Sequence, residues 1–162
     1  MSKSAKLPQV VISANTVPEL VEGLNGLLAD AFAIYLKTKN FHWHVSGPHF
    51  REYHLLFDDQ AGQILAMTDI LAERVRKLGG RTLTSIGAIS RHQSLTDNDA
   101  DTVTPAAMLK ELIGDNAAVV AALRNVHEIC ADHNDFASAS LLENFIDETE
   151  QRIWFLKQTA SA

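Results

Sequence analysis

The longest uninterrupted helical pattern constrains the fold of this chain more than any other feature. Residues 50–78 keep helical periodicity without an internal proline, and Gly79-Gly80 ends the pattern. If all of these residues are helical, they form a rod of roughly 43 Å. Because an amphipathic rod must bury its apolar side, it needs partners of similar length. The chain must therefore supply other long helices that pack alongside it.

Three further helical patterns supply these partners. The first runs from Thr16 to about Val45, where a glycine and a proline at positions 47 and 48 stop it. Another begins at Thr104-Pro105, an N-cap followed by proline at the first helical position. The last ends near Leu156, and Ile153 and Trp154 close its apolar stripe. The turn between the first two helices is short, which predicts that they lie antiparallel.

Residues 79–103 connect the second long helix to the third, and residues 86–92 within them can form a short helix. A connection of this length can span a bundle from end to end. The chain is therefore predicted to be all-α, a ferritin-like four-helix bundle with a long crossover that carries a short extra helix. The predicted organisation is a flexible, weakly basic tail over 1–15, the bundle over 16–157, and a short C-terminal tail over 158–162.

Composition excludes several other classes of protein. The chain has 162 residues, which suits one domain, and a net charge of −6, which disfavours a protein that coats nucleic acid with its whole surface. A single cysteine, Cys130, excludes an internal disulfide and a cysteine-based zinc cluster. No apolar run approaches the ~18 residues of a membrane span, and no secretory signal is visible. We therefore expect a cytoplasmic protein with no membrane partner.

Several polar side chains lie where the helical pattern calls for apolar ones. His42 continues the apolar side of the first helix, and His54, Asp58, Asp69 and Glu73 share an arc of roughly 100° on the second. Each of them alone is most simply a solvated or a core residue. Together, two histidines and three carboxylates are the ligands that a hard-to-borderline metal prefers. The set therefore predicts a metal site.

The spacing of these residues excludes one compact site within a single chain. Asp58 and Asp69 are eleven residues apart, roughly 16 Å along a helix, whereas paired metals lie only ~3.5–4 Å apart. The pairs His54/Glu73 and Asp58/Asp69 nevertheless share one midpoint, between residues 63 and 64. If the helix crosses its own copy antiparallel at that midpoint, each His54 meets a Glu73 of the other copy, and each Asp58 meets an Asp69.

Two other features agree with a site between two copies. Ala61, Gly62 and Ala66 are small residues near the crossing, and they would allow close approach. The motif Glu-x-x-His, which supplies the di-iron sites inside ferritin-like bundles, does not occur in the chain. The sequence therefore predicts two identical sites at a two-fold interface, each with ligands from two subunits.

These residues also carry a resemblance to a known family. The run KNFHWHVSGPHF over 39–50 resembles the signature of the Dps family, the DNA-binding proteins from starved cells or mini-ferritins. The segments 54–60, 69–74 and 78–80 match as well, and the likeness covers nearly the whole chain, including Ser90-Arg91-His92. The resemblance implies a hollow dodecamer, built from two-fold dimers, that oxidises Fe(II), preferentially with hydrogen peroxide, and stores the ferric mineral.

The same resemblance assigns residues to roles. His42, His54 and Asp58 of one subunit, with Asp69 and Glu73 of the two-fold mate, are implied as the iron ligands of a ferroxidase site, which in this family can hold two irons. Trp43 either packs at the interface or quenches radicals beside this site. The family's three-fold pores suggest three acidic candidates, Asp132, Asp135 and Glu143.

DNA binding is the other activity that the resemblance implies. In this chain it would rest on a tail that offers only Lys3 and Lys6, so we expect it to be weak, with multivalency in the shell as its main support. Two alternatives to the iron-storing enzyme stay open. One is a nucleoid-associated DNA-binding protein with a secondary metal site, and the other is a carrier of zinc or another divalent metal without turnover.

Overall fold

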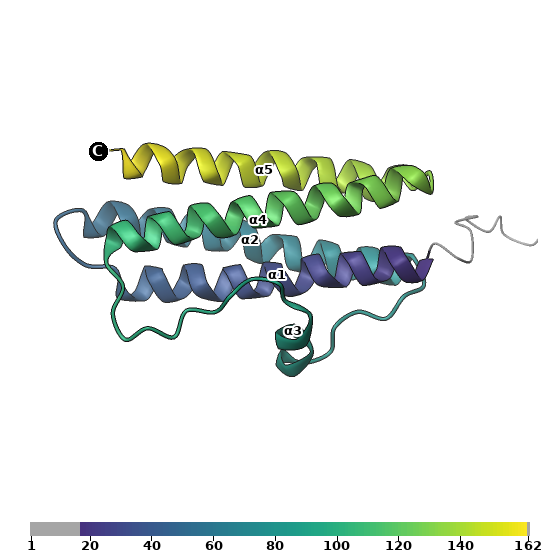
Figure 1. Ribbon diagram of the computed structural model, residues 1–162, viewed down its shortest axis with the longest axis horizontal. Helices are drawn as coiled ribbons and strands as arrows, with labels where there is room; N and C mark the ends of the chain where they lie inside the picture. The colour runs from purple at the N-terminus through teal and green to yellow at the C-terminus, as the bar shows by residue number, and fades with distance from the viewer. Residues whose placement is uncertain (1–16, 162) are drawn as a thin grey trace, which may run out of the picture.

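The computed structural model describes residues 17–161, and all the regular elements in this range are helices. The bounds are α1 Val17–His44, α2 Phe50–Lys77, α3 Ile86–His92, α4 Pro105–Asp132 and α5 Phe136–Ala160. The four long helices lie side by side, and the crossover from α2 to α4 runs along the outside of α1 and carries α3 (Figure 1). The prediction of an all-α, ferritin-like bundle with a short helix in its crossover is confirmed.

Packing divides the bundle into two hairpins. The closest partners are α1 with α2 and α4 with α5, and the hairpins join mainly where α1 meets α4. The main apolar core includes Leu24, Ile64, Leu71 and Leu123, and a second cluster around Phe41 and Phe57 fills the end near the α1–α2 turn. Burial of these side chains, at about 25 cal/mol per Å² of apolar surface, is the principal force that holds the hairpins together.

The helix ends follow the local signals in the sequence. Gly79 has φ 82° and ends α2 in the left-handed conformation that glycine adopts without strain. Gly80 is required for a different reason, because a Cβ at this position would clash with Cγ2 of Val21. At the start of α4, the Thr104 hydroxyl accepts a hydrogen bond from Ala107 N at 3.3 Å, and Pro105 follows as predicted.

The crossover is fixed to the bundle by two buried charged residues of α1. The Asp30 carboxylate accepts hydrogen bonds from the backbone of Ser94 and Leu95, at 2.6 and 3.2 Å. Lys37 donates to the carbonyl of Thr96 at 2.6 Å and forms ion pairs with two acidic residues of α4. These contacts satisfy backbone groups of a segment that has little regular structure of its own.

The last helix differs from its prediction in two ways. It runs to Ala160, so residues 158–160, expected to be part of a short tail, are helical. Its buried face continues through Thr149, Arg152 and Leu156, whereas Trp154, expected in the apolar stripe, is 58% exposed. The predicted N-terminal tail lies outside the described residues. No helix within 17–161 has the length and hydropathy that crossing a membrane requires.

Candidate metal centre

The short turn between α1 and α2 places His42 and His54 against each other. The two rings are stacked, with centroids 3.8 Å apart and planes inclined by 20°. Nδ1 of His42 lies 2.7 Å from the carbonyl oxygen of His54, and Nδ1 of His54 lies 2.8 Å from the carbonyl oxygen of His42. Each histidine is therefore oriented by the backbone of the other.

This reciprocal arrangement also selects the tautomer of both rings. A carbonyl oxygen can only accept a hydrogen bond, so Nδ1 must carry the proton in each histidine. The lone pair of each neutral ring is then on Nε2, the nitrogen that no backbone group occupies. Metal-binding histidines are commonly prepared in this way, because a fixed Nδ1–H orients the ring and raises the basicity of Nε2.

Asp58 completes this histidine half-site, and Lys39 pairs with it. Nε2 of His42 lies 3.9 Å from Oδ1 of Asp58, and Nζ of Lys39 lies 2.6 Å from the same oxygen. The hydrogen bond from Lys39 is the main reason why the pKa of Asp58 is lowered, and the carboxylate therefore stays ionised and able to bind a cation. Sequence reasoning gave Lys39 no role, although it precedes His42 by one helical turn.

The acidic half-site lies farther along α2. Asp69 and Glu73 are both exposed, and Glu73 accepts a hydrogen bond from Lys77 at 3.0 Å. Asp69 is separated from Asp58 by roughly 16 Å of helix, as the spacing predicts. Within residues 17–161, no group of three or more histidine, cysteine, aspartate and glutamate side chains is arranged to hold a metal ion. The single chain stacks His42 on His54 and places Asp58 3.9 Å from His42, and it leaves Asp69 and Glu73 farther along α2.

An exposed stripe on α2 joins the two half-sites. Leu55, Asp58, Gly62, Leu65 and Asp69 follow one another at intervals of three or four residues, so they share one face of the helix. Leu55 and Leu65 are 47% and 42% exposed, and a Cβ at Gly62 would meet nothing within 4 Å. The stripe therefore carries two exposed leucines and one open glycine beside its two aspartates.

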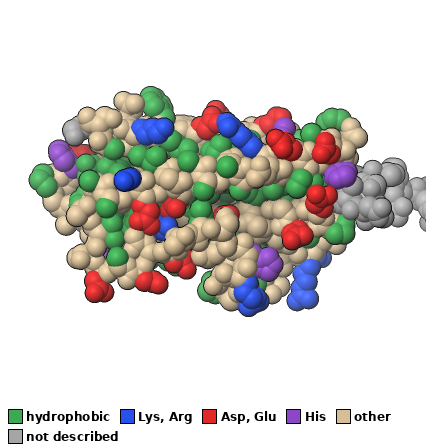
Figure 2. All heavy atoms as spheres, in the orientation of Figure 1, with side chains coloured by type: hydrophobic (Ala, Val, Ile, Leu, Met, Phe, Trp, Pro, Cys, Tyr) green, Lys and Arg blue, Asp and Glu red, His purple; other side chains and the backbone are tan. Residues whose placement is uncertain are grey.

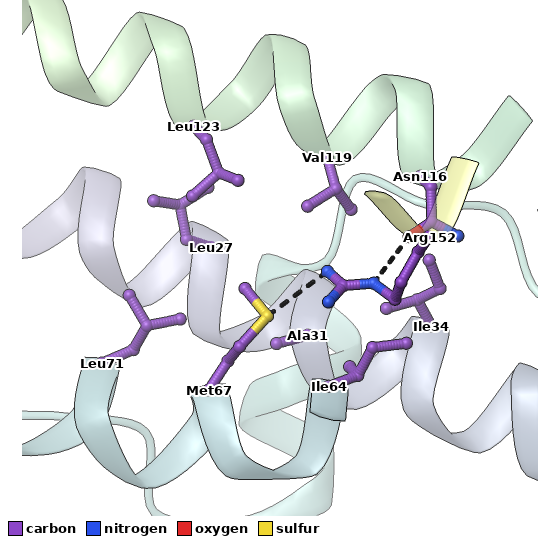
Figure 3. A pocket seen from close by; sticks show the side chains of 10 residues that line it. All are labelled: Leu27, Ala31, Ile34, Ile64, Met67, Leu71, Asn116, Val119, Leu123 and Arg152. Atoms are coloured by element: carbon purple, nitrogen blue, oxygen red, sulfur yellow. Dashed lines mark hydrogen bonds between the residues drawn. The ribbon is translucent and has the colours of Figure 1, made fainter. Parts of the chain in front are cut away.

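Among residues 17–161, the interior of the bundle provides no alternative metal site. Its central polar residues are Arg152, Asn116 and Thr149, and Figure 3 shows the Arg152 guanidinium between side chains of α1, α2 and α4. A buried cation repels ferrous ions, and none of these three residues is a carboxylate or an imidazole. The presence of Arg152 in the core and the absence of Glu-x-x-His from the sequence therefore both argue against a metal site inside the bundle.

The three pore candidates differ in their surroundings. Asp132 is exposed at the end of α4, and Glu143 is exposed and pairs with His127 Nε2 at 3.0 Å. Asp135 has different surroundings from the other two. It is 5% exposed, it caps α5, and its carboxylate accepts hydrogen bonds from Arg74 at 2.7 Å and from Ser138.

The remaining candidates lie at the surface or outside the described residues. Trp43 is 58% exposed, and Lys39 Nζ lies 5.9 Å from its ring, so packing against another subunit and radical quenching both remain open for it. Lys3 and Lys6 fall outside residues 17–161. On the face drawn in Figure 2, acidic and basic side chains are interspersed, and no continuous basic band is visible.

Comparisons with known proteins agree with this architecture. A family model for the ferritin-like domain matches residues 21–161. A low temperature-induced protein of Nostoc is 31% identical over 135 residues, which cover 83% of this chain and 75% of the relative. The DNA protection during starvation protein of Brevibacillus brevis is 28% identical over 83% of this chain and 89% of the relative.

Solved structures extend the agreement to three dimensions. The crystal structure of Dps from Thermosynechococcus elongatus superimposes with a TM-score of 0.86 at 28% identity, and covers 90% of this chain and 92% of its own. The domain match, the named relatives and the structural neighbours lead to one conclusion: this chain belongs to the Dps family of ferritin-like proteins.

Proposed function

We propose that the protein is a ferroxidase that oxidises Fe(II) at sites shared by two-fold related subunits and stores the ferric product inside a hollow dodecameric shell. The observation that carries the proposal is the division of the ligands on α2. A histidine half-site, in which backbone carbonyls hold both Nδ1 atoms and leave both Nε2 atoms without a backbone partner, lies on one side of the helix midpoint. An acidic half-site lies at the same separation on the other side.

The stripe on α2 supports the two-fold crossing that this function needs. The midpoint that relates His54 to Glu73 also relates Leu65 to Gly62. In an antiparallel crossing, each exposed Leu65 would lie over the open space at Gly62 of the other copy. The residues that join the half-sites are therefore self-complementary, as a two-fold interface requires.

The ligand types fit the oxidation of ferrous iron. Carboxylates bind Fe(III) more strongly than Fe(II), so Asp58, Asp69 and Glu73 would favour the oxidised product. The histidines would orient Fe(II), the substrate, which carboxylates bind more weakly. Two Fe(II) ions supply one electron each to hydrogen peroxide, which takes up two protons and leaves as two water molecules. The O–O bond then breaks without release of a hydroxyl radical. Lys39 Nζ would compete with iron for Oδ1 of Asp58.

A complementation experiment tests whether each site takes ligands from two chains. His54→Ala removes the histidine half and Glu73→Ala removes the acidic half, so each variant alone should lose rapid ferrous oxidation. If the two are unfolded, mixed in equal amounts and reassembled, half of the dimers contain both variants, and each of those has one intact site. About one quarter of the wild-type rate should return.

The control is a mixture of His54→Ala with His42→Ala, which damages the same half-site in both chains and should restore nothing. Light scattering must show that all the mixtures assemble to the same mass. If the first mixture stays inactive although it assembles, the shared site is refuted. If ferrous ions bind at the wild-type site while peroxide is not consumed, the protein is a metal carrier and not a ferroxidase.

DNA protection is the second candidate, and the names of the relatives favour it. In this chain, phosphate contacts would depend on the N-terminal lysines, because the net charge of the whole chain is −6 and residues 1–16 contribute only positive side chains. A gel shift that persists at physiological salt and disappears when residues 1–15 are removed would support DNA binding. If the truncated protein gives the same gel shift, the DNA-binding surface lies on the bundle and not on the N-terminal tail.

A further inference from the structure

Two exposed aromatic side chains adjoin each other at the C-terminal end of α5. Trp154 and Phe155 are 58% and 45% exposed, and their rings meet edge to face with centroids 5.0 Å apart. Arg152 and Leu156 of the same helix are buried. Because Trp154 is two residues from each of them, roughly 200° around the helix, its side chain points away from the core. The pair therefore forms an aromatic patch on the outer side of the helix, which we call the α5 patch.

The surface around the α5 patch is almost free of charge. Exposed carboxylates are frequent in the preceding turns of α5, at Glu143, Asp147, Glu148 and Glu150. Residues 151–161 contain none, and Lys157 is the only exposed charged side chain among them. Gln151 and Gln158, both exposed, lie one turn before and one turn after the aromatic pair. Aromatic enrichment together with depletion of charge is typical of the core of a protein–protein interface.

The α5 patch and the stripe on α2 lie on opposite sides of the bundle. Gln60 marks the side of α2 that faces α5, because its side-chain amide donates to the carbonyl of Arg152 at 3.1 Å. Asp58 and Gly62 of the stripe are each two residues from Gln60, so they point roughly 200° away from it. On the other side, α5 forms the edge of the bundle opposite α1 (Figure 1). A copy bound to the stripe therefore leaves the α5 patch uncovered.

A two-fold contact through α2 cannot build a shell by itself. Such a contact uses the same surface on both copies, so it is complete when two copies have joined. The shell of the proposed function therefore needs a second contact surface elsewhere on the chain. Where identical copies meet around a rotation axis, each residue lies near its own equivalents, and like charges would repel each other. The uncharged, aromatic α5 patch suits such a meeting better than the acidic turns that precede it.

We propose that the α5 patch is a second interface between copies of this chain, and that it joins two-fold dimers into the shell. The inference rests on the proposed function, which supplies the dimer. It assigns oxidation and storage to different contacts. The crossing of α2 completes the ferroxidase sites, and the α5 patch encloses the volume in which the ferric mineral collects. Dimers separated at the α5 patch therefore still oxidise Fe(II) but have no cavity to fill.

A charged double variant of the full-length protein tests this separation. Trp154→Glu with Phe155→Glu places like charges where the copies meet. In size exclusion with light scattering, the mass should fall about sixfold, to about 36 kDa, twice the chain mass of 17.8 kDa. Helical content and the initial rate of Fe(II) oxidation per chain should stay at the wild-type values, while co-eluting iron should be lost. Ala118→Glu, on an exposed position of α4, is the control and should keep both the mass and the stored iron.

The possible results separate this proposal from the proposed function. If the double variant keeps the mass of the shell, the α5 patch is not an interface, and the shared ferroxidase site is unaffected. If it dissociates to folded monomers, the patch belongs to the two-fold contact, which equally overturns the proposal. A folded dimer that fails to oxidise Fe(II) would support the second interface and refute the shared site.

Fluorescence quenching gives a second readout in protein whose α5 patch is unchanged. The chain has two tryptophans, so Trp43→Phe leaves Trp154 as the only one. In metal-free protein of full shell mass, acrylamide should barely quench Trp154, although this side chain is 58% exposed in the single chain. Efficient quenching at that mass would overturn the proposal. So would quenching that becomes efficient, at unchanged mass, when residues 1–15 are removed, because the N-terminal tail would then be what covers the patch.

Discussion

Replacement of Asp135 should be among the most destabilising single changes in this protein. Asp135→Ala removes the partner of Arg74 from an ion pair whose side chains are only 4% and 17% exposed, and it also removes the N-cap of α5. Loss of one partner from a buried pair costs about 3–5 kcal/mol, and loss of a cap costs about 1 kcal/mol. Arg74 retains a hydrogen bond to Ser138 and some solvent, so we expect a total of about 3–4 kcal/mol.

Asp135→Asn separates the two contributions. The amide oxygen can still cap α5, but the charge that pairs with Arg74 is lost. The free energy of unfolding should therefore fall by about 2 kcal/mol. For a chain of this size, each kcal/mol corresponds to about 2–4 °C in the melting temperature. We therefore expect the Ala variant to melt roughly 10 °C below the wild type and the Asn variant roughly 6 °C below it.

The pH dependence gives an independent check on the same charge. Burial alone would raise the pKa of Asp135, but the hydrogen bonds from Ser138 and Arg74 outweigh it, and the pKa is lowered from the ordinary 3.8. A lowered pKa in the folded state means that the stabilisation is complete above pH ~4 and is lost as the pH falls through the folded-state pKa. The gap between the wild type and Asp135→Asn should therefore be constant near neutrality and narrow below about pH 4.

The assay is thermal unfolding followed by circular dichroism, at one protein concentration because assembly also contributes to stability. Asp132→Ala is the matched control, since it removes an exposed acid three residues earlier and should change the melting temperature by less than about 2 °C. If Asp135→Ala also melts within that margin, the ion pair and the cap do not carry the stability assigned to them here.

Three further results are expected. Lys39→Met removes the cation 2.6 Å from Asp58 and should tighten Fe(II) binding up to about fivefold in titration calorimetry, whereas the exposed Lys110→Met should not. Gly62→Leu fills the open space on α2 and should leave helical content unchanged but reduce the assembled mass in light scattering, while Gly114→Leu on α4 should keep that mass. Cys130 is fully buried and burial raises the pKa of its thiol to about 11, so a thiol reagent at neutral pH should label it only after denaturation.

The sequence predicts the helices well wherever their ends carry a local signal. The start of α4 at Pro105, the end of α2 before Gly79-Gly80, and the short helix over 86–92 all agree with the structure. The end of α5 has no such signal, because residues 157–160 contain neither glycine nor proline. Helix formation simply continues there until Ala160.

Residues whose role depends on distant partners are harder to predict. Asp135 is one of several acids near the start of the last helix in the sequence, and only the fold shows that Arg74, 61 positions earlier, pairs with it. Arg152 would normally be assigned to a solvated face, yet it lies in the core because Asn116 and Thr149 accept its hydrogen bonds. The spacing on α2 depends on one helix and its periodicity, so it can be worked out from the sequence.

The division of the proposed metal centre has a consequence for assembly. Each half-site in the single chain already has its own cation, Lys39 on Asp58 and Lys77 on Glu73, so the separate subunit needs no metal to balance its charges. A two-fold crossing would bring three carboxylates together, and their mutual repulsion rises as water leaves the interface. An iron ion bound between the three carboxylates would replace their mutual repulsion with attraction to the metal. Ferrous ions should therefore favour the assembled state by mass action, and assembly should in turn be the step that creates the ferroxidase site.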